Sequence, residues 1–172
     1  GLPNPWYYEM SEPGFNYRAS DIHCALGLSQ LRKLDRFLDR RRELAGFYAQ
    51  ALVPFSPLVT PVPRRTDCRD GWHLYVVHID FAAAGIGRAS LMRMLKERGI
   101  GTQVHYLPIH RQPYYRSRYG GLQLPGADAY YDTCLSLPLF PAMGQDDIER
   151  VVSSLREIIV ERGAQLGLRG TS

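Results

Sequence analysis

The most informative pattern in the chain is the spacing of its apolar residues, which recur every three or four positions in several stretches. This spacing places the apolar side chains on one face of a helix. It predicts two helices joined with little gap over 21–52, a helix over 90–98 and a last helix over 145–162. The apolar face of the second helix consists of Leu34, Phe37, Leu38, Leu44, Ala45, Tyr48 and Leu52.

Three other stretches have the composition of strands. Trp72–Phe81 is dense in β-branched and aromatic residues, and Gly101–Tyr106 and Cys134–Leu137 are shorter apolar runs. Glycines separate the first strand, the helix at 90–98 and the second strand, an order that indicates an α/β unit. We therefore expect an α/β fold with a small mixed sheet, covered on one side by the helices at 90–98 and 145–162.

These elements divide the chain into three expected parts. Residues 1–52 are predicted to form an N-terminal arm and long interdomain helices, whose apolar faces are partly exposed. Residues 53–162 are predicted to form a small C-terminal α/β domain, and 163–172 a frayed tail. Proline is frequent in Val53–Asp70, which predicts a surface connection and not an inner strand.

Composition places the chain among ordinary globular proteins, with 172 residues, 45% of them hydrophobic and 22% charged. No run of 18 apolar residues is present, so no membrane span is predicted. The cysteines Cys24, Cys68 and Cys134 are far apart, which predicts neither a zinc site nor a disulfide framework and fits a reducing cytoplasm. His73 and His78 fall on opposite faces of a regular strand, so no metal site is expected there.

The net charge of +4 permits an acidic partner, and the run Arg40-Arg41-Arg42 raises the possibility of nucleic acid. Asp39 and Glu43 flank this run at salt-bridge spacing. The pattern therefore favours a solvated helix face over a nucleic-acid surface.

A polar trio, Asn16, Tyr17 and Arg18, follows the turn signal Pro13-Gly14 and precedes a predicted helix N-terminus. Ser20 and Asp21 are both plausible N-caps of that helix. Free N–H groups and the helix dipole favour anions at such a position. The alternative is structural: Asn16 and Arg18 would then satisfy the turn backbone and a surface carboxylate.

The stretch from Gly14 to Leu31 resembles the DegT/StrS family of sugar-nucleotide aminotransferases, which use pyridoxal phosphate (PLP). Further motifs of the family follow in order: His73-Leu74-Tyr75-Val76, the stretch 99–115, and Ser136–Pro141. The resemblance covers nearly the whole chain. Within the family, the likeness is to enzymes that aminate UDP-4-keto-6-deoxy-N-acetylhexosamines, including those of pseudaminic acid synthesis.

This resemblance implies the C-terminal small domain of a fold-type-I PLP enzyme. It implies a cytoplasmic homodimer that moves an amino group, usually from glutamate, to a nucleotide-linked 4-keto-6-deoxy sugar for cell-surface polysaccharides. Neither lysine of the chain, Lys33 or Lys96, lies in the family's lysine motif, which would come before Gly1. We therefore expect no catalytic residue in this chain and no transamination by the chain alone.

The resemblance also suggests site residues. Asn16 is expected to reach the PLP phosphate of a neighbouring subunit, with Arg18 and Tyr17 in the same region. His110, His105 and Tyr106 are candidates for substrate contacts. A regular strand would send His105 and Tyr106 to opposite faces, so at most one of them would reach the pocket.

Two other readings stay open at this point. The chain could be a stand-alone dimerisation or ligand-binding module that keeps the fold without the reaction. It could also bind nucleic acid through its arginine-rich helix, with steep salt dependence.

Overall fold

The computed structural model of the chain describes residues 6–7, 9–65 and 67–167, and of 161–167 it describes the helical backbone alone. Residues 1–5 and 8 of the predicted arm and 168–172 of the predicted tail lie outside the described residues. The chain forms two compact units, residues 1–35 and 36–172.

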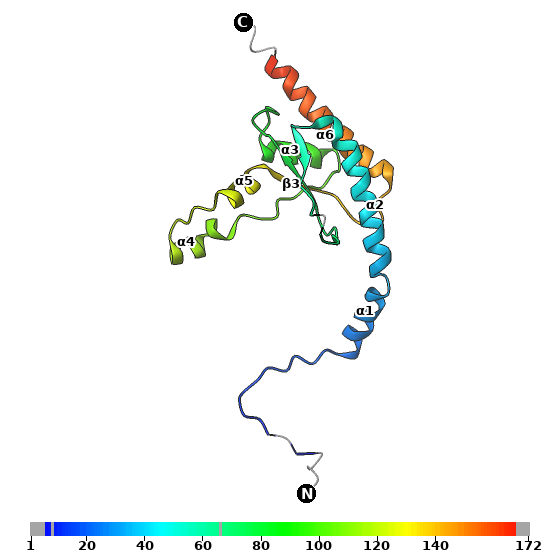
Figure 1. Ribbon diagram of the computed structural model, residues 1–172, viewed down its shortest axis with the longest axis vertical. Coiled ribbons are helices and arrows are strands. Elements are labelled where there is room, and N and C mark those ends of the chain that lie inside the picture. Colours follow the sequence, from blue (N-terminus) through cyan, green and yellow to red (C-terminus); the bar gives the residue numbers. More distant parts are fainter. Residues whose placement is uncertain (1–5, 8, 66, 168–172) are drawn as a thin grey trace. The chain divides into compact units, whose positions relative to one another are not determined.

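The first unit consists of an extended arm and helix α1 (Asp21–Leu31) (Figure 1). Ser20 is the N-cap, because its side-chain oxygen accepts from the backbone N–H of His23. The helix buries none of its residues, and Ile22 is 81% exposed. Its apolar side chains therefore face solvent, whereas partial exposure was expected for both interdomain helices.

The second unit is built on a three-stranded sheet in the order β1-β2-β3. The strands are β1 (Val59–Pro61), β2 (Tyr75–Ile79) and β3 (Cys134–Leu137), and both pairings are antiparallel. Proline lacks a backbone N–H, which is consistent with the edge position of β1 inside the proline-rich stretch.

The prediction of a mixed sheet with a strand at Gly101–Tyr106 is wrong. Only Gln103 pairs in this stretch, through two backbone hydrogen bonds with Ser136 of β3, at 2.8 and 3.2 Å. The side-chain oxygen of Gln103 then accepts from the N–H of Val104 at 2.9 Å. That N–H is therefore not available to a ladder, and the sheet remains antiparallel throughout.

One face of the sheet carries the core. Tyr75, Val77 and Ile79 alternate along β2 and are all buried. They pack with the buried faces of α2 (Leu34–Leu52), α3 (Arg88–Glu97) and α6 (Gln145–Gly167). The helical contributors are Leu44, Ala45, Tyr48, Leu52, Leu91, Leu95, Ile148, Val151, Val152, Leu155, Ile158 and Ile159.

The sequence predicted that the helices at 90–98 and 145–162 cover one side of the sheet, and α3 and α6 do so. Helix α2 also packs on this face. Residues 36–52 pack into the second unit, whereas the expected division grouped them with the arm. The reason is the apolar face of α2, which finds its partners on the sheet. Helix α6 also continues to Gly167, five residues past the predicted end at Arg162.

The opposite face of the sheet meets helix α5 (Pro125–Thr133). His78 points to this face, and its Nδ1 lies 2.7 Å from Oγ1 of Thr133. Its ring makes an edge contact with Tyr130 at 5.4 Å. The remaining elements are the 3-10 helices η1 (Val53–Phe55) and η2 (Ile109–Arg111) and helix α4 (Pro113–Tyr119).

Aromatic stacking joins α2 to β2. The rings of Tyr48 and Tyr75 stack with centroids 4.5 Å apart, and Trp72 stacks on the other side of Tyr75 at 5.7 Å. The Tyr48 hydroxyl donates to the carbonyl of Pro138 at 2.9 Å, whereas the buried Tyr75 hydroxyl has no partner among the described residues. Burial raises the pKa of Tyr75 to about 12 and that of Tyr48 further.

The arginine run of α2 serves mainly to hold loops. Nη1 of Arg41 donates to the carbonyls of Trp72, His73 and Leu139 at 2.9, 3.2 and 3.0 Å. Arg40 pairs with Glu43 and reaches the carbonyl of Met143, and Arg42 pairs with Asp39. The ion pairs of Arg40 and Arg42 agree with the predicted solvated helix face. Arg41 is instead partly buried and holds three loop carbonyls, and we call it the carbonyl clamp. Because these side chains are engaged within the protein, the run does not support a nucleic-acid surface.

No helix in the described part of the chain is both long enough and apolar enough to cross a membrane.

The two stacked tyrosines allow a matched test. Tyr48→Phe should lower the free energy of unfolding by about 1–2 kcal/mol, because the Pro138 carbonyl loses its donor. Tyr75→Phe should leave this free energy unchanged or raise it, because it removes a buried hydroxyl without a partner. Urea denaturation of both variants measures the difference, and equal losses would contradict the assigned hydrogen bonds.

A second pair of variants tests the carbonyl clamp. Arg41→Met keeps the apolar stem but removes the donor to three carbonyls, so we expect a loss of about 2–4 kcal/mol in unfolding free energy. Arg42→Met removes one exposed ion pair and should cost less than about 0.5 kcal/mol. Thermal or urea unfolding compares them; a similar small effect at both positions would show that the carbonyl contacts do not stabilise the fold.

Candidate functional site

The Asn16 loop of the first unit is held by a local hydrogen bond. The side-chain oxygen of Asn16 accepts from the backbone N–H of Arg18 at 3.1 Å, the geometry of an Asx turn. The Asn16 side-chain oxygen therefore satisfies the turn backbone, which is the structural role considered above for this residue. The amide nitrogen, which carries two N–H donors, has no partner in the part of the chain described and remains available.

Tyr17 and Arg18 accompany this turn on the surface. Tyr17 is 87% exposed, and its ring lies tilted against Phe15 at 5.7 Å. The Arg18 side chain is exposed, and within the described residues it forms no ion pair. The expected surface carboxylate is therefore not found, and the loop presents an amide and a guanidinium to solvent.

His105 and Tyr106 lie together in the second unit, after the single bridge to β3. Nδ1 of His105 is 2.8 Å from Oγ of the buried Ser136, which fixes the ring against the sheet. Tyr106 is 72% exposed, and its ring contacts that of His105 edge-on at 4.8 Å. The peptide bond between them is cis. Because this stretch is not a regular strand, the expected alternation of the two side chains does not apply.

His110, the third candidate for a substrate contact, is largely buried. It lies in η2 and is only 9% exposed. Its Nε2 is 3.0 Å from Oδ1 of Asp128 in α5, and Nε of Arg111 is 2.5 Å from the same oxygen. The ring of His110 is therefore engaged with α5, and it connects η2 to that helix.

Asp128 is the centre of this network. Desolvation alone would raise its pKa, but the hydrogen bond from His110 and the charge of Arg111 outweigh this and hold the pKa below its ordinary value. Arg111 also reaches Asp132 at 3.3 Å and stacks over the ring of Tyr131. The carboxylate thus remains charged and is neutralised by its neighbours.

Sequence reasoning missed Asp128 and Arg111 as members of a polar network with His110. Asp128 pairs with a histidine 18 positions away, and no local spacing rule links residues at that distance. The only signal was the arginine-rich composition of the stretch that follows His110.

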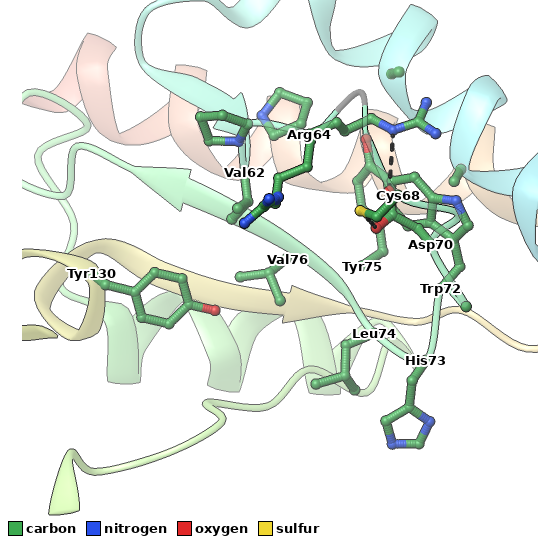
Figure 2. Close-up of a pocket in the computed structure, with 16 residues that line it drawn as sticks. Val62, Arg64, Cys68, Asp70, Trp72, His73, Leu74, Tyr75, Val76 and Tyr130 are labelled. Carbon is green, nitrogen blue, oxygen red and sulfur yellow. Dashed lines mark hydrogen bonds and ion pairs between the residues drawn. The ribbon is translucent and has the colours of Figure 1, made fainter.

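A cavity of about 400 Å³ lies between α2, the connection from β1 to β2, and Tyr130 of α5 (Figure 2). Trp72 and Tyr75 line it, and Arg64 stacks over Trp72 at 4.7 Å while pairing with Asp70 at 3.5 Å. Figure 2 shows the His73 ring pointing away from the other side chains of the cavity. None of the predicted site residues lines this cavity.

No group of three or more potential metal ligands (His, Cys, Asp or Glu) occurs among the residues that the structure describes. The polar residues described above form three sets: the Asn16 loop, the His105–Tyr106 pair, and the His110–Asp128–Arg111 network.

Comparison with known proteins gives consistent matches over most of the chain. The spore coat polysaccharide biosynthesis protein SpsC of Bacillus subtilis is 42% identical over 157 residues, which are 90% of this chain and 40% of SpsC. The chain thus spans about 40% of the length of this curated relative.

Solved structures give the same result. PseC of Helicobacter pylori, an aminotransferase of pseudaminic acid biosynthesis, superposes with a TM-score of 0.81 at 26% identity, covering 92% of this chain and 42% of PseC. DesI, solved with its TDP-sugar product, superposes with a TM-score of 0.75 at 30% identity, covering 87% of this chain and 38% of DesI. The α/β fold with a small antiparallel sheet is therefore that of aminotransferase structures.

The sequence profile of the DegT/DnrJ/EryC1/StrS aminotransferase family matches residues 3–156. This match covers most of both compact units and all the polar residues of the three sets. The chain therefore belongs to the DegT/DnrJ/EryC1/StrS aminotransferase family.

Proposed function

We propose that this chain is the C-terminal part of a sugar aminotransferase that transfers an amino group, from glutamate, to a nucleotide-linked 4-keto-6-deoxy sugar. The family match over residues 3–156 carries this proposal. The nucleotide-sugar substrate is supported by PseC, a protein of pseudaminic acid biosynthesis, and by DesI, which was solved with a TDP-sugar. SpsC, a polysaccharide biosynthesis protein, supports a role in cell-surface polysaccharides.

Family members depend on PLP, which supplies an electron sink when bound. The Asn16 loop fits the phosphate of this cofactor, because the Asn16 amide and the Arg18 guanidinium are exposed donors without partners among the described residues. Tyr17 lies beside them and is a weaker candidate. In our proposal Asn16 reaches the phosphate in a neighbouring subunit of a homodimer.

The lysines do not fit the covalent attachment of the cofactor. Lys33 is half-buried in the short turn between α1 and α2, and its backbone N–H donates to the carbonyl of Gln30. Lys96 is exposed in the last turn of α3, where a cation interacts favourably with the helix dipole. Neither lines a described cavity, so we infer that the chain alone does not transaminate.

Three residues are proposed for the substrate side. Tyr106 is the most exposed and would contact the substrate directly. His105 is fixed by Ser136 and would orient Tyr106 through the ring contact. His110 is engaged with Asp128 and would act as a positioning residue for η2.

We place the protein in the cytoplasm. Cys24, Cys68 and Cys134 are all free thiols, as expected in a reducing compartment.

A stand-alone dimerisation or ligand-binding module is the second candidate function. The placement of Lys33 and Lys96 favours it for the isolated chain, because neither is positioned to hold the cofactor covalently. It predicts a stable dimer of the 172-residue chain without cofactor attachment.

Cofactor attachment tests the lysine inference. PLP added to the 172-residue chain should give no borohydride-reducible bond to one specific lysine and no amino transfer. Absorbance scans, reduction and peptide mass mapping measure this, and Lys33→Arg and Lys96→Arg serve as controls that should change nothing. Specific labelling of either lysine together with turnover would refute the inference.

Substitution of Asn16 in the complete enzyme tests the loop. Asn16→Asp keeps the oxygen that accepts from Arg18 N–H, so the turn is preserved, but it replaces the amide donor by a negative charge. We expect the Kd for PLP to rise roughly 10- to 100-fold, from the loss of a charge-assisted hydrogen bond and added repulsion of the phosphate. A fluorescence titration of PLP measures this.

Asn16→Ala removes both the donor and the turn acceptor, and it should weaken PLP binding less than Asn16→Asp. Gln30→Ala on α1 is the matched control and should leave the affinity unchanged. Unaltered PLP affinity in Asn16→Asp would argue against a role of Asn16 at the phosphate.

A further inference from the structure

A polar hollow of about 380 Å³ lies between η2, α4 and α5, and we call it the cationic hollow. It is separate from the cavity of Figure 2. Its polar lining residues are His110, Arg111, Arg116, Gln123 and Asp128. Its volume falls at the small end of the usual range for ligand sites, about 300–1,000 Å³.

The single acid of the cationic hollow is already neutralised. Oδ1 of Asp128 is 3.0 Å from Nε2 of His110 and 2.5 Å from Nε of Arg111. Nε of Arg111 contacts Asp128 and its Nη1 donates to Asp132, and its Nη2 forms no hydrogen bond among the described residues. The carboxylate therefore does not cancel the remaining positive charge.

Arg116 is an exposed side chain of α4. It lines the cationic hollow, and in the described part of the chain its guanidinium has no ion pair and no hydrogen bond. The Gln123 side chain, on the loop after α4, likewise has no partner among the described residues. Arg118, two residues further along α4, differs: its Nη1 donates to the Tyr114 hydroxyl at 3.1 Å, and it does not line the hollow.

The donors that converge here suit anionic oxygens. A guanidinium presents N–H groups in a planar fork that matches phosphate or carboxylate, and a side-chain amide adds further N–H donors. Two arginines against one acid give this concave wall a net positive charge, which concentrates anions. Arg116 differs from an ordinary surface arginine by its place in the wall of a hollow, and not by its exposure.

We propose that the cationic hollow binds the phosphoryl groups of the nucleotide-linked substrate, with Arg116, Nη2 of Arg111 and the Gln123 amide as donors. This inference rests on the proposed function, which supplies the nucleotide sugar. The same chemistry would suit the carboxylate of the amino donor, and the experiment separates the two sources. The role of Asp128 is then to hold Arg111 and His110 in place around the ligand.

Binding of UDP to the 172-residue chain tests the proposal by calorimetry, with inorganic phosphate and glutamate as competitors. We expect Arg116→Gln to weaken UDP binding roughly tenfold or more, because a charge-assisted contact is lost. Arg118→Gln, a matched change on the same helix, should leave the affinity within about twofold. Inorganic phosphate should displace UDP, and UDP should shift the Gln123 side-chain amide resonance.

Equal UDP affinity in Arg116→Gln and Arg118→Gln, or resonance shifts confined to other residues, would overturn the assignment of the hollow while leaving the aminotransferase proposal intact. Displacement of UDP by glutamate but not by phosphate would overturn the phosphoryl source. Absence of any binding by UDP, phosphate and glutamate would overturn the site itself. The proposed function is tested independently through PLP retention in the Asn16 variants.

Discussion

The second unit depends on the contact between α2 and the central strand of the sheet. Tyr48 and Tyr75 are both fully buried and stacked, so the helix and the strand share one interface of large aromatic area. The Tyr48 hydroxyl then ties this interface to the loop after β3 through the Pro138 carbonyl. A sheet of three short strands has little stability by itself, and α2 supplies the cover that makes its inner face a core.

The arginines of α2 extend this packing to the surrounding loops. Arg41 satisfies the carbonyls of two loops that have no secondary structure of their own, and Arg40 adds the carbonyl of Met143. Buried carbonyls need donors, and a guanidinium can serve several at once. The basic run that resembles a nucleic-acid motif in the sequence is thus largely explained by internal hydrogen bonding.

The polar groups outside this core fall into those that are satisfied and those that are not. His105 and His110 are engaged with Ser136 and Asp128, which makes them positioning residues in our interpretation. The amide of Asn16 and the guanidinium of Arg116 are left without partners in the described chain. A structural role accounts for the first group but not for the second, and it is on the second that the proposals rest.

The amino-acid sequence by itself indicated the long helices, a strand within Trp72–Phe81, the strand at Cys134–Leu137, Ser20 as one of two candidate caps, and the family, because these depend on local spacing and on motifs in order. It did not determine that Gly101–Tyr106 lacks a ladder, since strand composition says nothing of the partner. Only the tertiary structure brought His110 to Asp128 and α2 onto the sheet. Those contacts join residues far apart in the chain, and side-chain chemistry alone does not specify which distant partner each group meets.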